Sequence, residues 1–246
     1  MTHETRTRAR IGVLVPFTNT NLEPDMMLMR CPDTTVHFQR MGGYDVDEIP
    51  GSDQMAGLGA SDISHDLRMI SGVRPDVVLY GCTSATLTHG PGFDADLAQQ
   101  IKAGSGAISL TAAGSLIKGI QAFGAAKVGF SSPYLGEINT QAMDFLAAHG
   151  IETVKCADVG RELGNYGQGD LTPDEVFALA CLADHPEAQA IVLSCTDMRA
   201  AEAVERIEAH LGKPVITSNQ AMMFCLMKAL ELPRHDALPG RLFDQL

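Results

Sequence analysis

Two of the six cysteines in this chain stand where a thiol could do chemistry. Cys82 and Cys195 each follow a short apolar run, and each is followed by a threonine. A thiolate is both a strong nucleophile and a good leaving group, so two facing thiols could add to a small molecule or move its protons. Taken alone, each residue could equally be a buried cysteine at the end of a strand. The repeated Cys-Thr pattern favours the catalytic interpretation.

The other cysteines and the histidines form no known metal motif. No CxxC pair occurs, and the eight histidines contain no HExxH or HxxxH pattern. Cys181 and Cys225 fall within apolar segments of helical periodicity and are expected in the core, while Cys31 and Cys156 lack the Cys-Thr setting. We therefore predict no metal site.

Polar but uncharged side chains follow several of the predicted strands. Hydroxyl and amide groups, together with backbone N–H groups, are suited to cradling carboxylate oxygens. The same residue types also serve in turns and helix caps, and that alternative stays open for Asn19 and Tyr134 considered singly. The candidates are Thr18, Asn19, Thr20, Asn21, Thr83, Ser84, Tyr134 and Thr196.

Short β-branched runs alternate along the chain with longer segments of helical periodicity. This alternation, with strands that are apolar throughout, predicts an α/β fold whose parallel strands are covered by helices on both faces. Strands are expected at Ile11–Val15, Thr35–Gln39, Val77–Tyr80, Ala107–Leu110, Lys127–Phe130, Ile151–Lys155, Ala190–Leu193 and Val215–Thr217. Helices are expected at Asp62–Ile70, Asp94–Ala103, Thr111–Phe123, Leu135–Ala148, Pro173–Leu182, Arg199–Leu211 and Asn219–Leu230.

The chain also repeats itself. Arg10–Pro16 resembles Lys127–Pro133, the segments around the two Cys-Thr pairs resemble each other, and Ala107–Thr111 resembles Val215–Asn219. Three pairs in the same order predict two pseudo-symmetric α/β lobes, each with a parallel sheet of about four strands. We expect residues 1–114 plus 218–246 in the first lobe, on which the C-terminal helix packs, and 115–217 in the second. Since ligands bind beyond the carboxyl ends of parallel strands, both thiols should face the cleft between the lobes.

The composition limits the kinds of molecule that this protein is expected to bind. The chain has 246 residues, with 18 Lys and Arg against 30 Asp and Glu, and a net charge of −12. Phosphate binding needs clustered basic residues, so neither nucleic acid nor an anionic membrane is an expected partner. No apolar run reaches the roughly 18 residues of a membrane span. The polar, basic segment Met1–Arg10 does not resemble a secretory signal. We therefore expect a cytoplasmic protein that acts on a small molecule.

Several short segments together resemble the maleate cis-trans isomerase family of the Asp/Glu racemase superfamily. That superfamily also includes arylmalonate decarboxylase and ectoine-utilisation proteins of the EutA type. The resemblance implies the two-lobed fold and a homodimer or homotetramer. The segments that carry it are Val15–Thr20, Tyr80–Ser84, Ser132–Tyr134, Gly164–Pro173 and Ser194–Arg199.

The resemblance further implies an activity. It is the cofactor-independent cis-trans isomerisation of a small unsaturated dicarboxylate, maleate to fumarate, through a covalent cysteine-succinyl intermediate. Cys82 would be the nucleophile and Cys195 the proton donor. The implied substrate-binding residues are Asn19, Thr83, Ser84, Tyr134, Asn165 and Thr196.

Some residues depart from the family pattern and leave other activities open. Asp197 stands where maleate isomerases commonly have asparagine, and it adds a negative charge near a dianion. Amino-acid racemases usually have Asp-Ser-Gly where this chain has Pro16-Phe17-Thr18, and arylmalonate decarboxylase keeps only the second cysteine. The alternatives are a two-cysteine amino-acid racemase, an enzyme like arylmalonate decarboxylase, and a non-catalytic carboxylate-binding protein.

Overall fold

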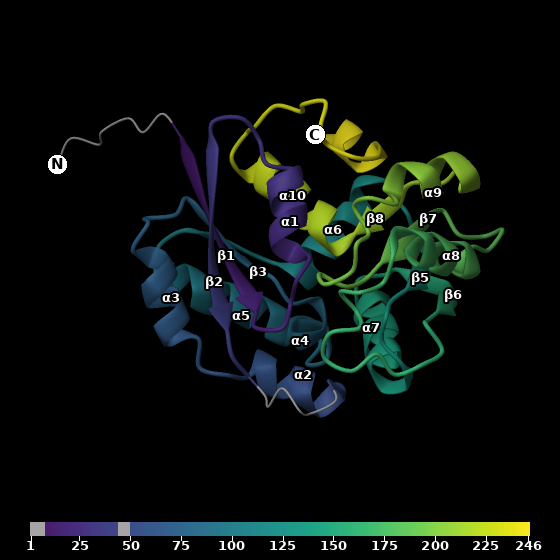
Figure 1. The fold of residues 1–246 in the computed structure, drawn as a ribbon, viewed down its shortest axis with the longest axis horizontal. Helices are drawn as coiled ribbons and strands as arrows, with labels where there is room; N and C mark the ends of the chain where they lie inside the picture. The colour runs from purple at the N-terminus through teal and green to yellow at the C-terminus, as the bar shows by residue number, and fades with distance from the viewer. Residues whose placement is uncertain (1–7, 44–49) are drawn as a thin grey trace.

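Two parallel sheets form the framework of the protein (Figure 1). The computed structural model describes residues 8–43 and 50–246. The first sheet has the strand order β2-β1-β3-β4, with β1 (Ala9–Pro16), β2 (Thr34–Met41), β3 (Val77–Tyr80) and β4 (Ile108–Thr111). The second has the order β6-β5-β7-β8, with β5 (Lys127–Ser131), β6 (Glu152–Ala157), β7 (Ala190–Leu193) and β8 (Val215–Thr217). Adjacent strands are parallel in both sheets, which confirms the predicted fold class.

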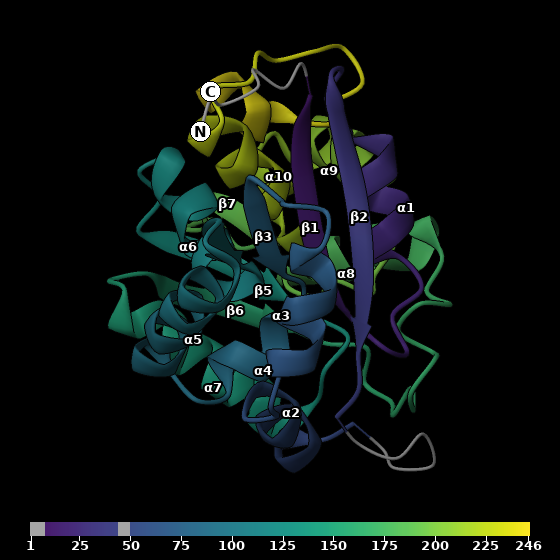
Figure 2. The ribbon, with the colours of Figure 1, turned by 90° about the vertical axis from the view of Figure 1, so that its left-hand side faces the viewer.

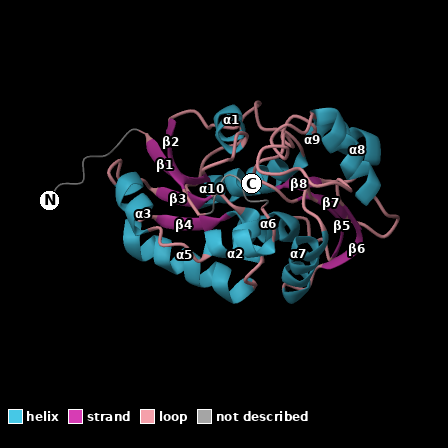
Figure 3. Cartoon of the chain, turned by 60° about the horizontal axis from the view of Figure 1, so that its bottom comes forward, coloured by secondary structure: helices cyan, strands magenta, loops and turns pink. Residues whose placement is uncertain are grey.

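Helices cover both faces of each sheet. In the described part of the chain they are α1 (Leu22–Leu28), α2 (Ser52–Gly59), α3 (Ser64–Ser71), α4 (Thr83–Leu87), α5 (Pro91–Ser105), α6 (Ala112–Ala122), α7 (Gly136–Ala148), α8 (Pro173–Ala183), α9 (Val204–Leu211), α10 (Ser218–Ala229) and the 3₁₀ helix η1 (Arg241–Gln245). Helices α3 and α5 cover one face of the first sheet (Figure 2), and α1 and α10 lie against the other. Helices α6 and α10 pack on each other between the two sheets (Figure 3).

The central strands β3 and β7 are buried along their whole length. All four residues of each strand are buried, because helices lie on both sides of the sheet. Both strands have the bounds predicted from the sequence. After each of these strands, a Cys-Thr pair begins two residues beyond the strand end.

The two sheets have the same strand order, with β5 to β8 in the places of β1 to β4. The hydroxyls of Thr111 and Thr217 also cap equivalent helices, each accepting a backbone N–H three residues further on at 3.1 Å. This agreement supports the predicted internal repeat. The lobe boundaries at residues 114/115 and 217/218 remain a proposal, because α10 contacts β4 and α1 on one side and α6 and β8 on the other.

Some helices differ from the sequence expectation. Helix α9 begins at Val204, whereas a helix was expected from Arg199; residues 201–203 form a turn before it. The Asp197 carboxylate, which could have capped an earlier start, is instead bound to the backbone N–H of Thr20 at 2.7 Å. Helices α1, α2 and α4 were not expected, because segments of five to eight residues hold too few apolar positions to define a period. Within the described residues, no helix combines the length and apolar character that crossing a membrane demands.

Candidate active site

Cys82 and Cys195 line one cavity at the carboxyl ends of β3 and β7. Its volume is about 30 Å³, which is room for one or two water molecules. Seven of the eight residues predicted for the site line it: Asn19, Cys82, Ser84, Tyr134, Asn165, Cys195 and Thr196. Among the residues that the structure describes, no Lys or Arg lines this cavity.

A larger pocket of about 250 Å³ lies beside this cavity. Three residues line both spaces: Pro50, Tyr134 and Gln168. Arg161 and Glu162 line only the larger pocket, which contains neither of the two thiols. The thiol cavity is therefore small, and most of the residues that line it are uncharged. It adjoins a larger pocket that has charged residues in its lining.

Cys82 is the N-cap residue of the short helix α4, and its side chain is 6% exposed. Its sulfur lies 3.6 Å from the Ser84 hydroxyl. Burial raises the pKa of the Cys82 thiol, while hydrogen bonds from the Ala85 backbone and from Ser84 act in the opposite direction. A position at a helix N-terminus favours the thiolate. The favourable donors are present, but desolvation outweighs them.

Cys195 has a different environment. Its side chain is 3% exposed, its sulfur accepts the Asp197 backbone N–H at 3.3 Å, and its S–H is directed at the Gln168 Oε1 at 3.6 Å. Burial and then the negative charge of Asp197 raise the pKa of Cys195 to about 12. The helix expected from Arg199 would have begun near this cysteine, but α9 begins only at Val204. Cys195 is thus a firmly protonated thiol at neutral pH.

Tyr134 lines the cavity together with both thiols. It is buried, and Cys195, Cys82 and Ser84 all act on its phenol. Burial raises the pKa of Tyr134 well above its ordinary value, with the neighbouring cysteines acting in the same direction. The backbone of Tyr134 is held in place, since its carbonyl accepts the Asn139 side-chain amide at 2.8 Å. A neutral phenol therefore lines the cavity with the two sulfurs.

Asn19 and Thr196 join the loops that follow β1 and β7. The Asn19 Nδ2 donates to the Thr196 Oγ1 at 3.0 Å, and that hydroxyl donates to the Gly81 carbonyl at 2.8 Å. The Asn19 Oδ1 accepts the backbone N–H groups of Asn21 and Leu22 at 3.1 and 2.9 Å, and so caps the start of α1. Asn19 therefore has a structural role at the start of α1 and also lines the cavity, and its role in binding a substrate stays a prediction.

The expectation that the Thr83 side chain lies in the cavity is wrong. The Thr83 hydroxyl donates to the Ser218 hydroxyl at 2.9 Å, and the residue is fully buried. Along α4, Cys82 and Ser84 face the cavity, so the residue between them points the other way, toward α10. Only the backbone of Thr83 could serve the site.

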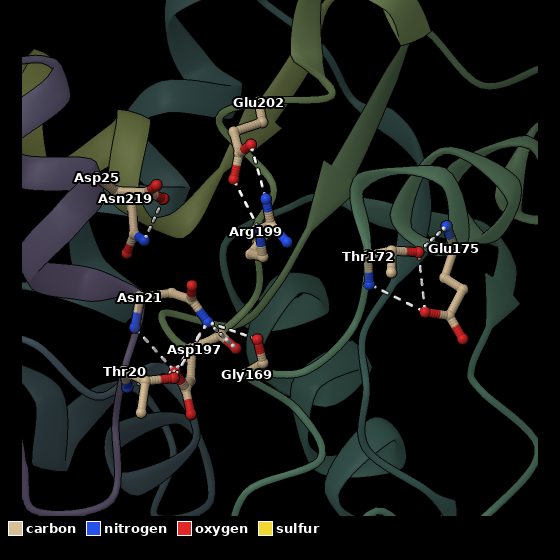
Figure 4. Close-up of polar contacts among 10 residues, drawn as sticks. All are labelled: Thr20, Asn21, Asp25, Gly169, Thr172, Glu175, Asp197, Arg199, Glu202 and Asn219. Carbon is tan, nitrogen blue, oxygen red and sulfur yellow. Dashed lines mark hydrogen bonds and ion pairs between the residues drawn. The ribbon is translucent and has the colours of Figure 1, made fainter.

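Asp197 and Gln168 also line the cavity and were not predicted as site residues. The Asp197 Oδ1 accepts four hydrogen bonds, from the backbone and side chain of Thr20 and of Asn21, at 2.7 to 3.2 Å (Figure 4). Burial raises the pKa of Asp197 to about 6, and these hydrogen bonds oppose the rise. Asp197 was recognised only as a departure from a family pattern. Nothing in the sequence indicated a role for Gln168, apart from its position in the segment Gly164–Pro173 that carries the family resemblance.

Comparisons with known proteins show the family of this chain. The family model described as arylmalonate decarboxylase matches residues 11–243. The chain is 28% identical to a maleate isomerase of Geobacillus stearothermophilus, with 96% of this chain and 97% of the relative covered. It is 29% identical to a maleate isomerase of Nocardia farcinica, with 96% of each covered. These relatives confirm the resemblance seen in the sequence.

A solved structure has the same fold. It is a cysteine-to-serine mutant of the Nocardia farcinica maleate cis-trans isomerase with a covalently bound succinylcysteine intermediate, and it is 24% identical to this chain. The TM-score is 0.86, with 97% of this chain and 99% of that one covered. Because the family model spans nearly the whole sequence, the chain belongs to the arylmalonate decarboxylase family.

Proposed function

We propose that this protein is a cofactor-independent isomerase that converts maleate to fumarate through a covalent adduct on Cys82. The observation that carries the proposal is the pair of buried thiols in one cavity with neutral donors, one at the start of α4 and the other beside Asp197. Two groups whose environments separate their pKa values can take the roles of base and acid at the same site.

In the active form, one of the two cysteines is a thiolate and the other is a protonated thiol. Hydrogen bonds from Ser84 and Ala85 act on the Cys82 sulfur, whereas Cys195 has the pKa of about 12 and lies beside Asp197. The negative charge therefore belongs on Cys82 and the proton on Cys195. Burial keeps this form scarce at neutral pH.

In the forward step, the Cys82 thiolate adds to C2 of the cis-enedioate. The π electrons move into the carboxyl group attached to C3, and an enediolate-like carboxylate forms. Neutral donors of the site, among them Tyr134, Ser84 and Asn165, would hold this charge as an oxyanion hole does. Their roles are part of the proposal.

Cys195 then gives its proton to C3, and a succinyl thioether on Cys82 results. Rotation about the new C2–C3 single bond changes the geometry from cis to trans. In the reverse step, the Cys195 thiolate removes a proton from C3, the C2–S bond breaks, and Cys82 leaves as a thiolate. Atoms and electrons balance, and the enzyme returns to its starting form. The covalently bound succinylcysteine intermediate of the Nocardia farcinica mutant enzyme supports a covalent route by similarity.

The small volume of the cavity means that side chains must move before the substrate can enter. A space of about 30 Å³ admits water but not a four-carbon diacid. The loops that carry Tyr134 and Gln168 separate this cavity from the 250 Å³ pocket, so substrate entry requires these side chains to move.

The direct test is incubation of the purified protein with maleate, followed by NMR detection of fumarate. Aspartate, glutamate and an arylmalonate are parallel substrates. Fumarate from maleate alone supports the proposal. Hydrogen exchange at the α-carbon of an amino acid, or loss of CO₂ from the arylmalonate, without any fumarate would replace it with two-base racemase or decarboxylase chemistry.

We also propose a cytoplasmic location and a homodimeric or homotetrameric state. All six cysteines are free thiols, as in proteins of a reducing compartment. Light scattering of the purified protein measures the oligomeric state.

A further inference from the structure

Asp197 is the one acidic side chain that lines the thiol cavity in the part of the chain that the structure describes. It is 6% exposed. Its Oδ1 accepts all four hydrogen bonds from Thr20 and Asn21, and none of the bonds that residues 8–43 and 50–246 donate to this carboxylate ends on Oδ2. The neighbouring Arg199 is bound to Glu202 at 2.8 Å and does not line the cavity (Figure 4).

This arrangement fits a dianion poorly. One carboxylate of a bound cis-enedioate can be held by neutral donors near the thiols, but a second carboxylate near Asp197 would meet a like charge in a poorly solvated space. Among the described residues, no cation in the cavity offsets that repulsion. A carboxamide at the same end would instead donate an N–H to the open carboxylate oxygen.

We infer that Asp197 is a specificity-determining residue that directs this site to cis-enedioate half-amides, with a carboxylate at one end and a neutral hydrogen-bond donor at the other. The inference rests on the proposed function, because it keeps the same addition, rotation and elimination and adds no reactant. It concerns only which end group the cavity accepts.

The variant that tests this is Asp197→Asn. The asparagine Oδ1 can still accept the hydrogen bonds of Thr20 and Asn21, so the loop contact is kept. The Nδ2 replaces the open oxygen by a donor and removes the charge. A matched control is Asp25→Asn, since Asp25 is 4% exposed and hydrogen-bonded to Asn219 but does not line the cavity.

The assay compares kcat/KM for maleate and for the half-amide of maleic acid, at a pH where maleate is fully a dianion. In the wild type, the half-amide should be favoured by roughly tenfold or more, the usual scale of one unfavourable charge contact. Asp197→Asn should move the ratio toward maleate by roughly the same factor. Asp25→Asn should leave the ratio as in the wild type.

A wild-type protein that favours the dianion overturns the inference, and this measurement needs no variant to fold. An unchanged ratio in a folded Asp197→Asn protein overturns it as well. These outcomes leave the proposed function intact. If the wild type isomerises neither compound and forms no adduct with either, the proposed function itself fails.

Discussion

Replacing Cys195 by alanine removes the group that we propose to protonate C3 and leaves the hydrogen bonds around Cys82 in place. With a pKa of about 12, the Cys195 thiol is protonated at neutral pH in nearly every molecule. Loss of a positioned general acid costs about 10²- to 10⁴-fold in rate, or about 3–5 kcal/mol in activation free energy. Cys195→Ala should therefore slow fumarate formation by that factor while addition to Cys82 continues.

The fold should tolerate the change. Cys195 lines an existing cavity of about 30 Å³ rather than a close-packed core. Removing one sulfur atom there should lower the free energy of unfolding by no more than about 1 kcal/mol, well below the cost of large core truncations. Urea unfolding of the variant measures this cost and separates lost chemistry from lost structure.

The assay combines fumarate detection with intact-protein mass and peptide mapping after incubation with maleate. Cys195→Ala should accumulate a succinyl adduct on Cys82, because water slowly supplies the proton to C3 while no base remains to remove it, whereas Cys82→Ala should show neither adduct nor turnover. Cys181→Ala is the matched control, because this partly exposed thiol lies on α8 outside the cavity. An adduct on Cys195 would reverse the two roles, and full activity in either cavity variant would refute the mechanism.

Three other measurements each test the role of a single residue. Because burial raises the pKa of Cys82 and the active form needs its thiolate, kcat/KM for maleate should rise with pH above neutrality; a flat pH profile would contradict this. Asn19→Ala leaves two backbone N–H groups without their acceptor and removes the donor to Thr196, so urea unfolding should show a loss of about 1–3 kcal/mol. Burial raises the pKa of Asp25 from 3.8 to about 7, so the unfolded chain loses this proton first and stability falls as pH rises between those values. Asp25→Asn should remove that fall, which is at most about 4 kcal/mol, and unfolding curves across the pH range measure it.

Much of the fold follows from local sequence. Continuous apolar runs of four residues, at 77–80 and 190–193, identify strands that are buried on both faces, and both strands have the predicted bounds. The internal repeat places Cys82 and Cys195 after equivalent strands. Within each parallel sheet the strand ends lie on one side, and the packing of the two sheets then brings both thiols to one cavity.

Three features of the site depended on the tertiary structure. The short helix α4 turns Thr83 toward Ser218 and away from the cavity that Cys82 and Ser84 line, and five residues are too few for a periodic pattern to show this. The bonds of Asp197 to the loop after β1 join residues far apart in the sequence. The raised pKa values of both thiols come chiefly from burial, which no local sequence pattern reveals. Side-chain direction, contacts across the two sheets and desolvation depend on packing of the whole chain, whereas strand positions depend on the apolar residues of each segment alone.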